Sequence, residues 1–118
     1  MKIDSKYYWI ATERLHELDN YDYSVQGSCD GKNMIGGEYI PAYSEFEKEN
    51  IGKAFKLIHS DDTNTASGSG LVSQAPSYGE SDFYCLKNAG ITVIVDPVTL
   101  AGKFDQSVAG LEDLNVNN

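Results

Sequence analysis

The chain has 118 residues, of which 41% are hydrophobic and 11% aromatic, so an intrinsically disordered chain is excluded and one small domain is expected. Its 18 acidic and 9 basic residues give a formal net charge of −9, which repels phosphate backbones and anionic lipid headgroups. Direct binding of nucleic acid or of a membrane is therefore not expected, and the apolar stretches are too short to span a bilayer.

The cysteine content and the first residues predict a cytoplasmic protein. Cys29 and Cys85 are too few for a disulfide framework, and no apolar signal region follows the first six residues. Two buried free thiols are the expected state of these cysteines.

The first segment, residues 6–18, carries two patterns. The four residues at positions 7–10 are aromatic or β-branched and favour a strand. Apolar residues also recur at helical spacing, at Tyr8, Ala11, Leu15 and Leu18. We predict a helix here, with a strand as the alternative.

Short strands are predicted in the glycine-punctuated stretch that follows. Tyr21, Tyr23 and Val25 alternate with polar residues, which is typical of a half-exposed strand. A second strand is predicted over residues 34–40. The Asp30-Gly31 pair between them favours a tight hairpin turn.

The clearest predicted helix spans residues 45–59. Ser44 is a suitable N-cap, and Glu47 three residues later completes a capping box. An apolar stripe is expected to pack on the sheet, formed by Ile51, Ala54, Phe55 and Ile58.

A polar stretch rich in glycine and serine, about residues 60–81, is predicted to be a long loop that is either functional or mobile. After it, residues 83–86 and 91–95 suit an antiparallel hairpin whose second strand is buried on both faces. A short helical turn ending at Gly90 is the alternative. Residues 98–104 suit an edge strand across a tight turn, and residues 105–114 have weak helical spacing.

These elements predict the α+β class: a small, mostly antiparallel sheet with one main helix (about 45–59) packed on it and minor terminal helices. The whole chain, residues 1–118, is expected to form a single domain that carries the long polar loop at about 60–81.

No pattern of residues predicts catalysis, a metal or a cofactor. The only histidines, His16 and His59, lie in no known nucleophile motif. The Gly68-Ser69-Gly70 run lacks the lysine that follows in a phosphate-binding loop. The chain is therefore predicted not to be an enzyme, and it has no predicted catalytic, cofactor-binding or metal-binding residue.

Tyrosines interleaved with carboxylates instead suggest a protein-binding surface, because tyrosine is favoured at interfaces and carboxylates pair with basic groups. The predicted partner-binding residues are Asp19, Tyr21, Asp22, Tyr23, Asp30, Asp61, Asp62, Tyr78, Glu80 and Asp82.

The function predicted from these features is an acidic inhibitor of a protein with a basic surface that handles nucleic acid. An immunity protein against a nuclease and a phage-encoded anti-defence inhibitor that mimics nucleic acid share this physics. The alternative is a small structural protein that self-associates.

Overall fold

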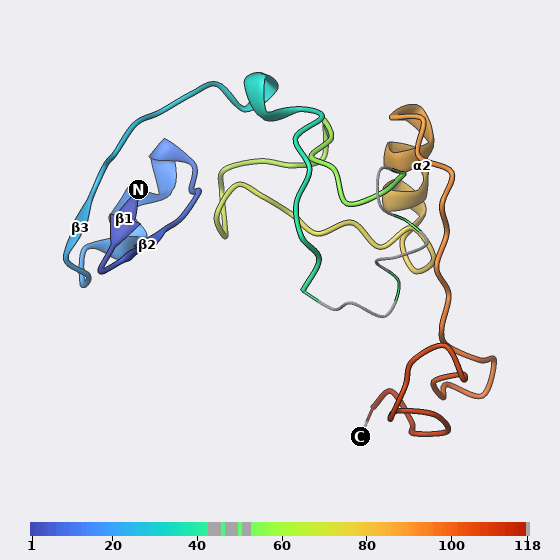
Figure 1. Cartoon of the computed structure of the whole chain (residues 1–118). Coiled ribbons are helices and arrows are strands. Elements are labelled where there is room, and N and C mark those ends of the chain that lie inside the picture. Colours follow the sequence, from blue (N-terminus) through green and yellow to red (C-terminus); the bar gives the residue numbers. More distant parts are fainter. Residues whose placement is uncertain (43–45, 47–49, 51–52, 118) are drawn as a thin grey trace. The chain divides into compact units, whose positions relative to one another are not determined.

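The computed structural model describes residues 1–42, 46, 50 and 53–117 (Figure 1). The chain divides into two compact units, and each is described here by itself. The first unit contains Met1–Ile35 and His59–Gln74, and the second contains Gly36–Ile58 and Ala75–Asn118. An antiparallel sheet combined with helices confirms the predicted α+β class.

The first unit contains a three-stranded antiparallel sheet in the order β2-β1-β3. Its strands are β1 (Lys2–Ile3), β2 (Lys6–Tyr7) and β3 (Tyr23–Ser24). β3 lies within the strand predicted from the alternation of residues 21–25. The pairing of β1 with β2 continues for one more residue, because the Tyr8 amide donates to the Met1 carbonyl at 2.9 Å.

The first segment satisfies both of its sequence patterns, on different stretches. β2 takes the aromatic start of the segment, and the 3₁₀ helix η1 (Thr12–Leu18) takes its later part. The predicted helix therefore begins later than expected. The turn between β1 and β2 contains Asp4 at a φ of 51°, a left-handed conformation that aspartate tolerates better than most residues.

The predicted hairpin between residues 21–25 and 34–40 is wrong. The Asp30-Gly31 pair instead leads into a second 3₁₀ helix, η2 (Gly31–Met34). In the second unit, residues 36–39 pair with residues 55–57. The Gly36 amide donates to the Leu57 carbonyl at 2.8 Å, and the Tyr39 amide donates to the Phe55 carbonyl at 3.0 Å.

This pairing overrides the later part of the main helix predicted over residues 45–59. Residues 53–59 contain no helix, because Lys56 forms a bridge with Glu38 and Phe55 has a φ of 58°. The rings of Phe55 and Tyr39 also meet edge to face, with centroids 6.0 Å apart. Most of the earlier part of that predicted helix (residues 43–45, 47–49 and 51–52) lies outside the described residues.

The helix α2 (Glu80–Asn88) replaces the predicted hairpin after the polar loop, so the helical alternative ending near Gly90 was the correct one. Acidic residues in its first turn and Lys87 in its last turn complement the helix dipole. Gly90 has a φ of 75°, as is common just past a helix end. Residues 91–95 form no strand, and Ile94 is 54% exposed, so the doubly buried strand predicted there is wrong.

The edge strand predicted over residues 98–104 is wrong, because this stretch forms a turn in which Val98 and Phe104 pair with each other as an isolated antiparallel bridge. The helical spacing of residues 105–114 produces turns instead of a helix. Gly110 and Asp113 have φ values of 82° and 64°, which a right-handed helix excludes. Within the described residues, Val108 is a buried hydrophobic side chain, with 8% of its surface exposed.

Among the described residues, no helix has both the length and the apolar character needed to cross a bilayer. Cys29 is exposed and Cys85 is half-buried, so the prediction that both cysteines are buried is wrong.

Asp105 caps the turn that follows the Val98–Phe104 bridge and gives a test by pH. Its carboxylate accepts hydrogen bonds from the Ser107 hydroxyl and from the Ser107 amide, the latter at 2.8 Å, and these bonds lower the pKa of Asp105. Because the folded pKa lies below the unfolded one, the stabilisation is present above the unfolded pKa. It is lost as the pH falls through the folded pKa.

We expect Ser107→Ala to raise the pKa of Asp105 toward that of an unfolded chain, because the hydroxyl bond is removed while the amide bond remains. An NMR titration of the Asp105 carboxyl carbon measures this shift. Ser81→Ala is the matched control and should leave the titration of Asp105 unchanged. An identical midpoint in Ser107→Ala and the parent chain would contradict the assigned cause.

Candidate functional site

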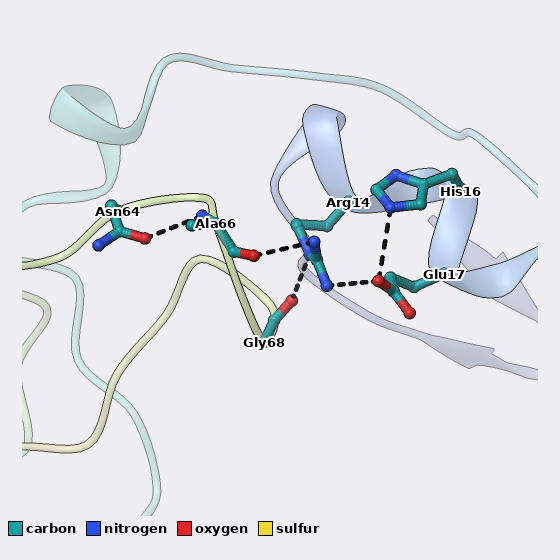
Figure 2. A network of polar contacts seen from close by, with 6 residues as sticks. All are labelled: Arg14, His16, Glu17, Asn64, Ala66 and Gly68. Carbon is teal, nitrogen blue, oxygen red and sulfur yellow. Dashed lines mark hydrogen bonds and ion pairs between the residues drawn. The ribbon is translucent and has the colours of Figure 1, made fainter.

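Arg14, on η1, makes three polar contacts within the first unit (Figure 2). Its guanidinium donates from Nε to the Gly68 carbonyl at 3.3 Å and from Nη1 to the Ala66 carbonyl at 3.1 Å. Its Nη2 lies 2.5 Å from a carboxylate oxygen of Glu17. We call residues 66–70 the Gly-Ser loop. We call Arg14, Glu17, Ala66 and Gly68 the Arg14 clamp, because the planar guanidinium of Arg14 joins η1 to this loop.

Further contacts hold the same loop against the start of η1. The Ala11 amide donates to the Ser69 carbonyl at 2.7 Å. The Asn64 side chain accepts from the Ala66 amide at 2.8 Å, as Figure 2 shows. A Cβ atom at Gly70 would lie only 2.7 Å from the Ala11 Cβ, so the close approach requires glycine. Residues 66–70 are therefore held by several backbone contacts.

The electrostatics of the clamp are satisfied within the chain. Arg14 is the only arginine, and its side chain is 15% exposed, whereas Glu17 is 51% exposed. His16 adds a second contact to the Glu17 carboxylate, at 3.4 Å. A guanidinium engaged in this way shapes the loop backbone and is poorly placed to meet the phosphate of a ligand.

The second unit has a polar cluster where the chain enters α2, in residues 75–82, which we call the α2 entry turn. Asp82 accepts from the Ala75 amide at 2.8 Å. The Ser77 hydroxyl donates to the Val95 carbonyl at 2.5 Å. These bonds fix the turn to the first residues of α2 and to the segment that follows the helix.

Tyr78 belongs to the same turn, and its hydroxyl donates to the Asp96 carboxylate at 3.0 Å. The pKa of Tyr78 is raised, first by desolvation and then by the hydrogen bond and the negative charge of Asp96, although a hydrogen bond with the Val98 backbone acts in the opposite direction. A tyrosine is protonated at neutral pH in any case, so the phenol acts here as a hydrogen-bond donor to Asp96.

The ten predicted partner-binding residues fall in both units. The first unit holds the members up to position 62, and the second holds Tyr78, Glu80 and Asp82. Several of the acids already have partners within the chain. Asp30 pairs with Lys32 at 3.1 Å, and Asp61 pairs with His59 at 2.9 Å. Tyr21 remains largely exposed, at 59%.

Of the residues in these two clusters, only Tyr78, Glu80 and Asp82 were among the predicted site residues. Arg14 carried a signal, because a lone arginine in an acidic chain has many possible acceptors. Gly70 and Ala11 carried none, since the close approach of two small residues depends on tertiary structure. In the part of the chain that the structure describes, no three His, Cys, Asp or Glu side chains gather in a way that could hold a metal ion.

No family model matches the chain. The chain is 33% identical over 108 residues to the isoleucine--tRNA ligase of Protochlamydia amoebophila, a match that covers 90% of the chain and 10% of that protein. It is 38% identical over 78 residues to the protein of the same name from Bdellovibrio bacteriovorus, covering 66% of the chain and 7% of the relative. The Mycobacterium tuberculosis protein of that name is 33% identical over 92 residues, covering 78% of the chain and 8% of the relative.

These relatives overturn the predicted function. The chain resembles a segment of proteins named for joining isoleucine to tRNA, so the predictions of an inhibitor, an immunity protein or a phage anti-defence protein that mimics nucleic acid are wrong. The exclusion of nucleic acid as a partner class is overturned as well, because tRNA appears in the relatives' names.

The prediction that the chain is not an enzyme has to be compared with the relatives' names. The relatives are named as enzymes, and the chain spans only about a tenth of their length. Similarity to a segment of an enzyme does not assign the reaction to that segment.

Proposed function

We propose that this chain works as a supporting module of an isoleucine--tRNA ligase, the activity for which its relatives are named. The observation that carries the proposal is the 33% identity with the Protochlamydia amoebophila protein across 90% of the chain. The proposal places the chain in the cytoplasm, where tRNA is charged.

A supporting role is favoured by how the polar groups of the chain are used. Arg14 donates hydrogen bonds to two backbone carbonyls, and Asp82 accepts one from a backbone amide. Ser77 donates to a carbonyl in the same way. These contacts fix loop shape, which suits a module that holds backbone in position while other parts of the ligase supply reacting groups.

The charge of the chain limits its part in tRNA affinity. Affinity for nucleic acid comes largely from Lys and Arg that neutralise phosphates, and this chain has a formal net charge of −9. The main electrostatic attraction for tRNA is therefore assigned to the remainder of the ligase. The module is proposed to contribute shape and hydrogen bonds.

A segment exchange tests the proposal. The chain replaces the matching segment of the Protochlamydia amoebophila ligase, and formation of isoleucyl-tRNA is measured. The control replaces the same segment with a Gly-Ser linker of equal length. We expect the exchanged ligase to charge tRNA at least tenfold faster than the linker control, about 1.4 kcal/mol of transition-state free energy. A folded exchange that is no faster than the linker control rules the proposal out.

A further inference from the structure

We draw no further inference here: the strongest candidate, the run of exposed aromatic side chains in the first unit from Tyr7, in β2, to Trp9, carries none, because nothing in the structure shows what covers it.

Discussion

Replacing Gly70 by alanine is expected to lower the free energy of unfolding of the first unit by about 3 kcal/mol, because strain and overpacking add. Gly70 has a φ of 81°, a left-handed conformation that costs an L-residue about 1–2 kcal/mol. The added methyl would also lie 2.7 Å from the Ala11 Cβ. Ala11 cannot yield easily, because its Cβ is fixed to the backbone and its amide is bound to the Ser69 carbonyl.

Gly68→Ala is the matched control for this substitution. Gly68 has a φ of 63°, close to that of Gly70, but a Cβ there would meet nothing within 4 Å. We expect Gly68→Ala to cost about 1 kcal/mol, from backbone strain alone. The difference between the two variants isolates the contact with Ala11.

A second substitution, at Ala11, separates the cost of the contact between residues 11 and 70 from the cost of backbone strain at position 70. Ala11→Gly removes the methyl that Gly70→Ala would strike, and glycine is tolerated at the N-cap position of η1. The double variant should recover about 1–2 kcal/mol relative to Gly70→Ala. Native-state hydrogen exchange of residues 66–72 measures the opening free energy of the loop. Equal losses at positions 68 and 70 would contradict the close approach.

The fold was predictable where a pattern had one physical meaning. Alternation over residues 21–25 predicted β3, because an alternating pattern suits a half-exposed strand and no other element. The apolar run at residues 83–86 had two meanings, since it suits a strand and also one side of a helix. The Ala75 amide donates to the Asp82 side chain, seven residues later, at the start of α2. The spacing of apolar residues does not reveal a hydrogen bond between a backbone amide and a side chain, so this contact could not be predicted.

The Arg14 clamp lay beyond prediction for a different reason. Its acceptors are backbone carbonyls 52 and 54 residues away, in a loop whose Gly and Ser residues carry no apolar pattern. The error in function had a related origin. The net charge was counted over these 118 residues alone. The relatives are about ten times longer, and the basic residues in the rest of such a protein do not enter that count.

Arg14→Ala is expected to lower the opening free energy of the Gly-Ser loop by about 2 kcal/mol, the usual range for hydrogen bonds from a charged donor. The two carbonyls of Ala66 and Gly68 would lose their donor, and water replaces it only in part because the side chain is 15% exposed. Hydrogen exchange of residues 66–72 should rise about 30-fold, whereas exchange in α2, in the second unit, should stay unchanged.

Two further variants decide which contact of the clamp matters. Arg14→Lys keeps the charge but loses the fork, so it should recover less than half of the loss. Glu17→Gln should cost at most about 0.5 kcal/mol, because Glu17 is 51% exposed and such surface ion pairs are weak. A large effect of Glu17→Gln with a small effect of Arg14→Lys would show that charge, and not the fork on the two carbonyls, holds the loop. With the expected order of effects, the loop is held by geometry, and it should stay ordered in salt that screens the Arg14–Glu17 pair.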